Sequence, residues 1–352
     1  MHYDRTEIDR RSFLKTGVGV AAGAALLASG HRAHAAPAKK EITFPAGIPT
    51  RPFGKTGHVL PVLGHGGSAM VNSWASAYMV KLDSEEERVK MVRHAYDKGI
   101  RYFDTARVYS ESERIMGAAL KDVRENVYLA TKVADPSPDR TRLSLETSLK
   151  ELGTDYVDCL QVHSPVTEAL GADGAMKVYE QIAKLRDEGL VRFIGLTTHI
   201  AFEDVYKMID TGLFDQVLLA KGYMRRSMFT LLSDAKLEWR DKCIDRAHEL
   251  GMAIVAMKVM GANLLGQGSR TGVVPAADPV LAGKVPAAAL RYVLSDPRIS
   301  MLNVGISTKS DLDENLATMA ADTAYTDADK TVLASYSEQV YNSDHVKAMK
   351  TS

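Results

Sequence analysis

The fold of this chain is indicated first by the stretch Phe103-Asp104-Thr105-Ala106-Arg107-Val108-Tyr109. It begins as an apolar, strand-like run, passes through a carboxylate and ends at a tyrosine. Two further runs of the same kind follow, Ala130-Thr131-Lys132 and Gln161-Val162-His163, and each ends in a polar side chain. Because active-site residues of a parallel barrel come from the carboxyl ends of its strands, we expect these side chains to lie together.

Four of these side chains have the chemistry that a carbonyl reduction needs. A tyrosine hydroxyl normally loses its proton near pH ~10, and a neighbouring ammonium lowers that pKa, so Tyr109 beside Lys132 is expected to be a usable general acid. Asp104 would fix Lys132 and balance its charge, and the imidazole of His163 can hold the substrate oxygen. Each residue alone has an ordinary structural explanation, as a cap or a packing residue. The prediction rests on the four together, in this chain order.

The motif around Tyr109 resembles that of the aldo/keto reductase superfamily. Residues 104–109 read Asp-Thr-Ala-x-x-Tyr, and Ser-Glu-Ser-Glu-Arg at 110–114 and a helix containing Gly117 follow. The resemblance covers about residues 51–319. It implies a barrel whose mouth holds a nicotinamide dinucleotide, and the four catalytic roles given above.

The remainder of the chain alternates strand-like and helix-like runs. We expect barrel strands at residues 60–63, 101–105, 127–132, 156–163, 191–197, 216–220, 252–257 and 301–305. We expect helices at residues 84–98, 112–121, 174–187, 202–211, 238–250, 285–294 and 309–319, and one capped by Asp139 that carries Leu145, Leu149 and Leu152 on one face. Eight such units, without Gly-x-Gly-x-x-Gly after the first strand, favour an α/β fold of the closed (β/α)8 TIM-barrel type over a doubly wound sheet.

Two elements are expected outside the eight units, a hairpin before the barrel and a helical tail after it. A Gly-bearing turn over residues 53–59 predicts a hairpin, which in the resembling family closes the bottom of the barrel. The predicted domains are a signal peptide at 1–35, a linker at 36–50, the barrel at 51–325 and a helical tail at 326–352.

The N-terminus is expected to be a targeting signal. Asp9-Arg10-Arg11-Ser12-Phe13-Leu14-Lys15 precedes a mild apolar run, and Ala33-His34-Ala35 gives a small-x-small cleavage pattern. The paired arginines resemble a bacterial twin-arginine signal, which implies the twin-arginine export machinery as a partner and a periplasmic location. A basic flank on an ordinary secretion signal, or an amphipathic helix, is the alternative. The apolar run is too short for a stable membrane span of ~20 residues.

Charge and cysteine content exclude several classes of function. The 44 basic and 44 acidic residues give zero net charge, which argues against nucleic acid or acidic membranes as partners. Two cysteines, Cys159 and Cys243, are too few for a disulfide framework or a cysteine-held cluster. Strand alternation aims Cys159 into the barrel, whereas Cys243 falls on an outer helix, so no bridge between them is expected. The proposed chemistry implies no metal.

The resemblance also implies a set of cofactor-binding residues. The loop after the first strand would lie near the nicotinamide, the segment Gly195-Leu196-Thr197-Thr198-His199 would supply carboxamide contacts, and the eighth unit would hold the adenosine with its helix N-terminus facing anionic groups. The residues carried over are Gly66, Gly67, Ser68, Thr197, Thr198, Gly305, Ser307, Glu314 and Asn315. For Glu314 and Asn315, a solvated helix face is the alternative.

The chain departs from the family pattern at several of these positions. Met257 stands where many members place an aromatic residue against the nicotinamide, and Ala220 replaces a glutamine that often meets the carboxamide. Lys258 stands where a serine is common; it could reach the pyrophosphate or form a structural ion pair.

The choice between NADP and NAD is left open by the sequence. Gly305 and Asp311 stand where NADP-preferring members often carry Lys and Arg, and a carboxylate repels a 2′-phosphate. Lys258 or Lys309 could compensate for this loss of positive charge.

Two classes of function follow. The first is a dinucleotide-dependent oxidoreductase that interconverts a small carbonyl compound and an alcohol. The second is a binding module that senses dinucleotide redox state with little turnover. Loops above the barrel would select the substrate, at residues 71–81, 164–174, 222–234 and 261–283, and they carry Trp74, Tyr78, Tyr223 and Arg225.

Overall fold

The computed structural model describes residues 40–71, 82–265 and 279–352. The predicted signal peptide, the start of the linker, and Trp74 and Tyr78 lie outside the described residues, as does most of the loop at 261–283. Of the helices in the described part, none is both long and apolar enough to cross a bilayer.

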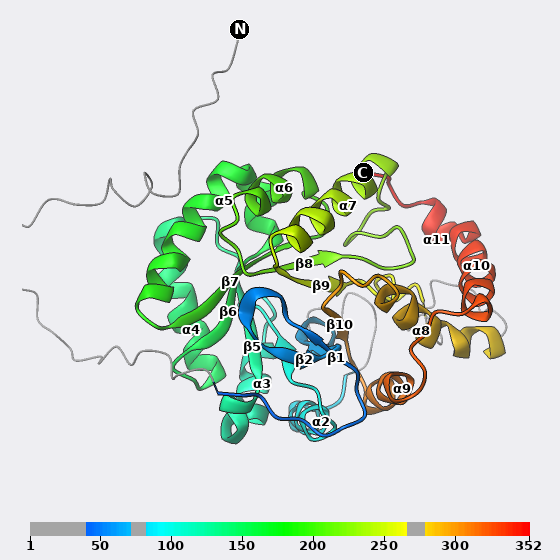
Figure 1. Cartoon of the computed structure of the whole chain (residues 1–352), viewed down its shortest axis with the longest axis horizontal. Coiled ribbons are helices and arrows are strands. Elements are labelled where there is room, and N and C mark those ends of the chain that lie inside the picture. Colours follow the sequence, from blue (N-terminus) through cyan, green and yellow to red (C-terminus); the bar gives the residue numbers. More distant parts are fainter. Residues whose placement is uncertain (1–39, 72–81, 266–278) are drawn as a thin grey trace, which may run out of the picture. The chain divides into compact units, whose positions relative to one another are not determined.

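The described part is built on a closed barrel of eight parallel strands (Figure 1), which confirms the predicted fold. The strands pair in the order β10-β3-β4-β5-β6-β7-β8-β9 around the barrel. In chain order they are β3 (Leu63–Gly66), β4 (Tyr102–Asp104), β5 (Tyr128–Val133), β6 (Val157–Val162), β7 (Val191–Thr198), β8 (Gln216–Ala220), β9 (Ala253–Met257) and β10 (Met301–Gly305).

A hairpin precedes the barrel, and here the predicted first strand is wrong. β1 (Thr50–Pro52) pairs antiparallel with β2 (Val59–Pro61), and η1 (Gly54–Thr56) connects them. The run expected at 60–63 therefore ends the hairpin, and the first barrel strand begins only at Leu63. One apolar run, residues 59–63, contains all of β2 and the first residue of β3, so hydrophobicity alone could not place the border between them.

The hairpin closes the bottom of the barrel, as predicted. Lys55 N donates to Gly251 O at 2.6 Å, which joins the hairpin to the turn before β9. Gly54 has φ +54°, and a Cβ there would lie 2.2 Å from Ala253 N, so only glycine permits this approach. Phe53 is fully buried against Tyr128, with ring centroids 5.0 Å apart.

Helices cover the outside of the barrel. They are α2 (Glu85–Asp97), α3 (Ser112–Leu120), α4 (Thr141–Leu152), α5 (Ser164–Asp187), α6 (Phe202–Asp210), α7 (Asp234–Glu249), α8 (Pro279–Leu294) and α9 (Lys309–Ala320). Leu145, Leu149 and Leu152 are buried on one face of α4, as predicted.

Three details of the helices differ from expectation. Asp139 does not cap α4: it lies in a preceding 3-10 turn, η4 (Pro138–Arg140), and the side chain of the N-cap residue, Arg140, pairs with Asp135 instead of capping the helix. α5 starts ten residues before the predicted helix and kinks at Gly171, where φ is +65°, so the loop expected at 164–174 is largely helical. α7 starts at Asp234 because the hydroxyl of Ser233 accepts a hydrogen bond from Lys236 N.

The barrel interior is filled by inward-facing side chains of the strands. Tyr102 and Tyr128 are fully buried and stack with centroids 5.5 Å apart. Cys159 belongs to the same interior cluster, as alternation predicted, whereas Cys243 lies on α7 and donates to Phe202 O. Both cysteines are free in the part of the chain described.

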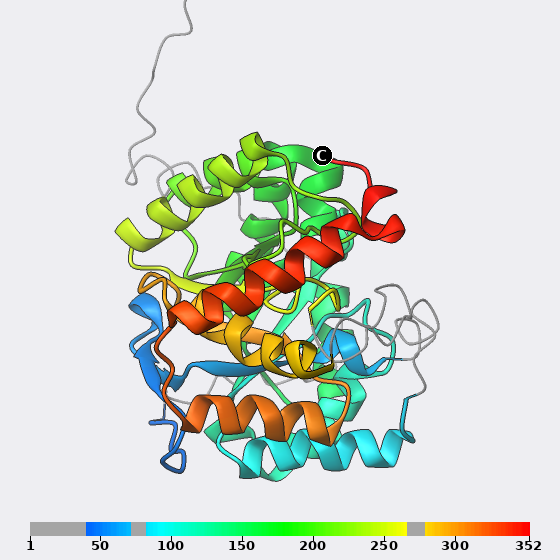
Figure 2. The same ribbon diagram turned by 90° about the vertical axis from the view of Figure 1, so that its right-hand side faces the viewer.

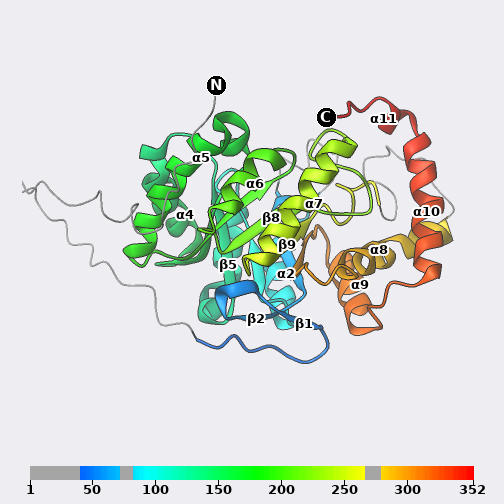
Figure 3. The same ribbon diagram turned by 45° about the horizontal axis from the view of Figure 1, so that its top comes forward.

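A helical tail follows the barrel, as predicted. α10 (Asp327–Asn342) and α11 (Asp344–Lys347) form it, and α10 crosses α8 (Figure 2). Leu333, Tyr336 and Val340 of α10 share an apolar cluster with α8. The end of the tail returns beside α7 (Figure 3), where Ser233 N donates to Ser352 O at 3.3 Å.

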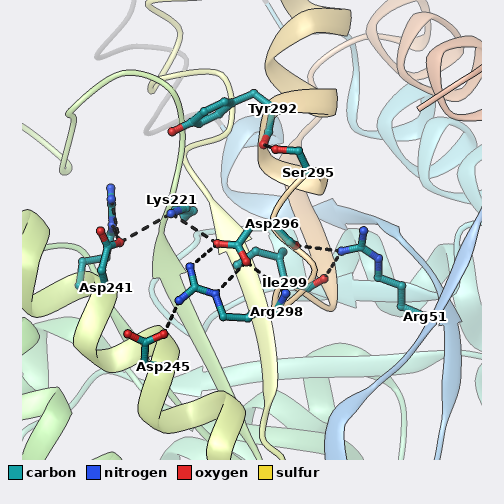
Figure 4. A network of polar contacts seen from close by, with 10 residues as sticks. Arg51, Lys221, Asp241, Asp245, Tyr292, Ser295, Asp296, Arg298 and Ile299 are labelled. Atoms are coloured by element: carbon teal, nitrogen blue, oxygen red, sulfur yellow. Dashed lines mark hydrogen bonds and ion pairs between the residues drawn. The ribbon is translucent and has the colours of Figure 1, made fainter. Parts of the chain in front are cut away.

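An ion-pair network fixes the connection that leads into β10 (Figure 4). Asp296, between α8 and β10, accepts two bonds from Arg298 at 2.6 and 2.9 Å, and Lys221 lies 3.7 Å away. Burial alone would raise the pKa of Asp296, but the hydrogen bonds from Arg298 hold it below its usual value. Arg51 of β1 donates to the carbonyls of Leu294, Asp296 and Ile299. The hairpin and β10 are therefore held together at the bottom of the barrel.

Candidate active site

A pocket opens at the carboxyl ends of the strands, with an empty volume of about 980 Å³ counted out to its open mouth. Its polar lining comes mainly from the ends of β3, β4, β9 and β10, and much of its apolar lining is methionine. The lining residues are Gly66, Ser68, Ala69, Asp104, Tyr109, His199, Leu218, Met228, Met257, Lys258, Val259, Met260, Ala262, Asn263, Asn303, Val304, Gly305 and Ser307.

Tyr109 reaches this pocket from a tight turn between β4 and α3. Tyr109 N donates to Ala106 O at 2.9 Å, and Ser112 N donates to Tyr109 O at 2.8 Å. Between them, Ser110 adopts φ +41°, a left-handed conformation that is uncommon outside glycine. Thr105 and Ser112 join their hydroxyls at 2.8 Å across the turn. The tyrosine is thus held by both elements that flank it.

A buried glutamate explains part of the Ser-Glu-Ser-Glu-Arg motif. Glu113, at the start of α3, is only 1% exposed. Its carboxylate accepts from Thr131 Oγ1 of β5 at 2.7 Å and forms an ion pair with Arg107 of the tyrosine turn. Glu113 therefore locks this turn to the strand that carries Lys132.

Lys132 points into the barrel beneath Tyr109. Its ammonium donates to Asp104 Oδ1 and to Thr105 O, both at 2.6 Å, and lies 4.9 Å from the centre of the Tyr109 ring. Burial alone would lower the pKa of Lys132, but the charge of Asp104 raises it above its usual value. Lys132 is therefore a permanent cation next to the phenol.

The pKa of Tyr109 differs from the sequence-based expectation. Burial raises it above the usual value, and this effect outweighs the charge and hydrogen bond of Lys132, which lower it. The lowered pKa was expected from the charge of Lys132 alone, without the desolvation of the Tyr109 hydroxyl, which raises the pKa. In this state Tyr109 is fully protonated at neutral pH, the form that a proton donor needs.

His163 lies beside Tyr109, with ring centroids 5.9 Å apart and planes at 80°. Burial, and then the charge of Lys132, lower the pKa of His163 to about 3, so the ring is neutral. Its Nδ1 has no hydrogen-bond partner among the described residues. A second imidazole, His199, lines the pocket, and its pKa is also far below the usual value because of burial and the charge of Lys258.

Some of the predicted cofactor residues form the pocket wall. Gly66, Ser68, Lys258, Gly305 and Ser307 all line it. Met257 lines it too, at the position where the family usually has an aromatic ring.

Other predicted cofactor residues lie off this wall. Gly67 meets α3 instead, because a Cβ there would lie 2.3 Å from Ser112 Oγ. The hydroxyls of Thr197 and Thr198, at the end of β7, accept from Ser164 N at 2.9 Å and Ile200 N at 3.2 Å. Glu314 is exposed on α9, whereas Asn315 is buried. Their contacts with a cofactor stay predictions.

The loop residues expected to meet substrate also make structural contacts. The Tyr223 ring packs on Tyr292 with centroids 5.1 Å apart, and Arg225 forms an ion pair with Asp234. The end of β8 places Leu218, rather than Ala220, on the pocket wall.

Lys258 is a cation at the pocket in an unusual conformation. It follows β9 directly and adopts φ +63°, and its ammonium lies 3.6 Å from Met228 Sδ. Burial, and then the charge of Arg226, lower its pKa to about 8. A cation that lines a pocket, with a second cation close behind it, favours an anionic ligand group.

The amides that hold Asp104 were not predicted from the sequence. Asn303 of β10 donates from Nδ2 to Asp104 Oδ1 at 3.1 Å, and Gln161 of β6 donates to Asp104 Oδ2 at 2.8 Å. The available signal was the period of two along β10, which turns Met301, Asn303 and Gly305 inward. No family motif marks Asn303, so it was not singled out.

Comparisons with known proteins identify the family and the signal at the N-terminus. The chain matches the Aldo/keto reductase family over residues 63–275, and residues 7–28 match the TAT (twin-arginine translocation) pathway signal sequence, which indicates export by that pathway. L-galactose dehydrogenase of Arabidopsis thaliana is 27% identical, over 77% of this chain and 88% of that protein. Methylglyoxal reductase DkgA of Escherichia coli O157:H7 is 33% identical, over 52% of this chain and 62% of that protein.

Solved structures agree on the fold. An aldo-keto reductase from Bacillus halodurans in its holo form superposes with a TM-score of 0.63 at 19% identity, covering 85% of this chain and 99% of that one. With the family match over most of the barrel, the chain belongs to the aldo/keto reductase family, whose members are oxidoreductases of the carbonyl–alcohol type that generally use NAD(P)H.

Proposed function

We propose that the protein is a nicotinamide-dinucleotide-dependent oxidoreductase that interconverts a carbonyl compound and an alcohol, with Tyr109 as general acid and base. The observation that carries this proposal is the buried Asp104–Lys132 pair, 2.6 Å apart, beneath a tyrosine that lines the pocket. A buried ion pair is by itself weak evidence for stability. We therefore assign this pair a role at the pocket rather than in holding the barrel together.

The pocket residues fit a nicotinamide dinucleotide. Lys258 and the nearby Arg226 offer positive charge for a pyrophosphate, and Met257 and Leu218 offer apolar surface for a ring. When bound, the dinucleotide supplies or accepts the hydride at the carbonyl carbon.

The protein's own groups handle the oxygen. In the reducing direction, Tyr109 Oη gives its proton to the carbonyl oxygen, and the charge of Lys132 stabilises the phenolate that remains. Asp104 holds the Lys132 ammonium in place and balances its charge. His163, neutral at physiological pH, can donate an N–H to the same oxygen without competing as an acid. Positioned acid–base catalysis of this kind contributes ~10²–10⁴-fold.

Export fits a cofactor that is bound early. The twin-arginine route carries folded proteins, so the protein can take up its dinucleotide in the cytoplasm. We expect purified, exported protein to release a nicotinamide dinucleotide when it is denatured, which absorbance and mass spectrometry of the released material would identify.

Turnover distinguishes the enzyme from a sensor of dinucleotide redox state. The purified protein is mixed with NADPH or NADH and a panel of aldehydes and ketones, and loss of absorbance at the dihydronicotinamide band is followed. We expect reduction of at least one carbonyl compound. Tight dinucleotide binding without turnover on any member of the panel, or on alcohols with the oxidised cofactors, would favour the sensor.

A further inference from the structure

Asn303 occupies a fixed orientation between Asp104 and the pocket. It lies on β10, is 8% exposed, and lines the pocket. Its Nδ2 is 3.1 Å from Asp104 Oδ1, an oxygen that also accepts from Lys132. A carboxylate paired with an ammonium only accepts hydrogen bonds, so the NH₂ of Asn303 must face Asp104 and its oxygen must face away.

The oxygen of Asn303 is an unused acceptor. Asn303 Oδ1 is buried and has no hydrogen-bond partner among the residues that the structure describes. A Cβ at Gly66, across from it, would lie only 3.1 Å from this oxygen. The space beside the oxygen therefore exists because residue 66 is glycine. Buried acceptors are nearly always paired, so this one is expected to meet a donor when the pocket is filled.

We propose that Asn303 is a positioning residue that links the bound dinucleotide to Asp104, with Nδ2 holding the carboxylate and Oδ1 accepting a hydrogen bond from a ribose hydroxyl. The inference rests on the function proposed above. Ribose hydroxyls are the most numerous donors of a dinucleotide, and Gly66 and Gly305, on the strands that pair beside Asn303, leave room for such a group at the pocket wall.

A second amide holds the same carboxylate but does not reach the pocket. Gln161 Nε2 donates to Asp104 Oδ2 at 2.8 Å, and Gln161 Oε1 accepts from Gln216 Nε2 at 3.1 Å. Gln216 also donates to Tyr102 Oη at 2.9 Å. Gln161 is fully buried and is not part of the pocket lining among the described residues. Both amides thus hold the Asp104 carboxylate, and only Asn303 also presents an oxygen to the pocket.

The hydrogen bonds that both amides donate to Asp104 should affect the pKa of Tyr109. Among the described residues, Asp104, Lys132 and His163 are the charged or titratable groups that face Tyr109, from β4, β5 and the end of β6. Asp104 raises the pKa of Tyr109. Amide donors disperse the charge of that carboxylate, so removing one should strengthen its field and raise the pKa of Tyr109 further.

The test compares Asn303→Leu with Gln161→Met, both close in volume to the residue replaced. Dissociation constants for NADPH and NADH are measured by titration calorimetry, and kcat for reduction is measured against pH. Both variants should move the alkaline limb of kcat to higher pH. Asn303→Leu should also weaken the preferred dinucleotide at least fivefold, whereas Gln161→Met should leave its Kd within twofold of wild type.

Each alternative outcome overturns a defined part of the proposal. A Kd within twofold of wild type for Asn303→Leu would show that the oxygen holds no ligand. Equal weakening by both variants would show that Asn303 acts only through the structure of the site. If the alkaline limb of kcat does not move in either variant, Asp104 does not connect these amides to Tyr109. Asn303→Ala replaces Asn303→Leu if the latter does not fold. If wild-type protein binds neither dinucleotide, the proposed function itself fails.

Discussion

Among single residues, Lys258 should give the proposed binding of a dinucleotide a pH dependence. Its ammonium is at the pocket, and its pKa in the free protein is about 8. An anionic ligand binds the protonated form, so bound Lys258 keeps its proton to higher pH. Affinity should therefore be constant below pH 8 and fall above it, by up to ~10-fold per pH unit.

Titrations of NADPH or NADH between pH 7 and 9.5 measure this effect. Lys258→Arg is the matched control, because a guanidinium stays charged over the whole range and should make the affinity flat. A wild-type Kd that does not change between pH 7 and 9.5 would show that Lys258 does not meet the anionic part of the ligand.

Asp311 should weaken the preference for NADPH. Its carboxylate sits in the first turn of α9, close to the pocket-lining Ser307, and accepts from Thr308 N at 3.1 Å as part of a capping box. Asp311→Asn keeps a side-chain acceptor for the cap and removes only the charge. We expect the ratio of Kd for NADH to Kd for NADPH to rise about threefold to tenfold, or ~1 kcal/mol. An unchanged ratio would place the 2′-phosphate elsewhere.

The sequence predicted residues that a motif marks and missed those that only packing defines. Asp104, Tyr109, Lys132 and His163 were identifiable because their chemical types recur at strand ends in chain order. Asn303 was not, since an amide in an inward strand position is common and its partner is 199 residues away in sequence. The direction of the Tyr109 pKa also depended on burial, which no local pattern reports.

At the scale of elements, the packing of α3 determines where Tyr109 lies. Gly117 of α3 meets the end of α4, and a Cβ there would lie 2.5 Å from Leu152 O. Backbone cannot move as a side chain can, so Gly117→Ala should push α3 outward and lower the free energy of unfolding by at least ~2 kcal/mol. Because α3 also carries Ser112 and Glu113, which hold the tyrosine turn, kcat should fall as well.

Gly153→Ala is the control for this prediction. Gly153 ends α4 with φ +62°, and no atom lies within 4 Å of its added Cβ, so it should cost only the ~1–2 kcal/mol of a left-handed conformation. Its kcat should equal that of wild type. If Gly117→Ala also retained full kcat, the position of α3 would not govern the tyrosine.

Element boundaries were predictable where period and capping agreed. α2 starts where the helix at 84–98 was predicted to start, because the hydroxyl of Ser84 caps it by accepting from Glu87 N. The border between hairpin and barrel was not, because one apolar run, residues 59–63, crosses it and the two strands have different tertiary partners. The early start of α5 was hidden by Gly171, which ends one helical segment but lets a second follow directly.

At the scale of the whole molecule, buried imidazoles should make the fold sensitive to acid. His65 is fully buried, and both its ring nitrogens lack hydrogen-bond partners among the described residues. Burial lowers its pKa to about 4 from an ordinary value of 6.5. The unfolded chain therefore binds this proton first, and stability is lost as pH falls from 6.5 towards 4.

His65→Leu should remove this loss. Between pH 7.5 and pH 5, the variant should lose about 2 kcal/mol less unfolding free energy than wild type. Urea unfolding at the two pH values measures the difference. Equal losses in wild type and variant would mean that other groups account for the acid sensitivity.

The eight-unit barrel could be predicted from the alternation of strands and helices, because that pattern has few closed solutions. The packing of α10 on α8 required tertiary contacts that no single stretch of sequence contains.

Tyr109 is the proposed proton donor, and Tyr109→Phe removes the donor group. The substitution removes only the hydroxyl, and the ring that faces Lys132 and His163 remains. With a carbonyl substrate that the wild type reduces, we predict that kcat falls at least ~10²-fold while the Kd of the dinucleotide stays within about threefold. Turnover by Tyr109→Phe close to that of wild type would show that Tyr109 is not the proton donor.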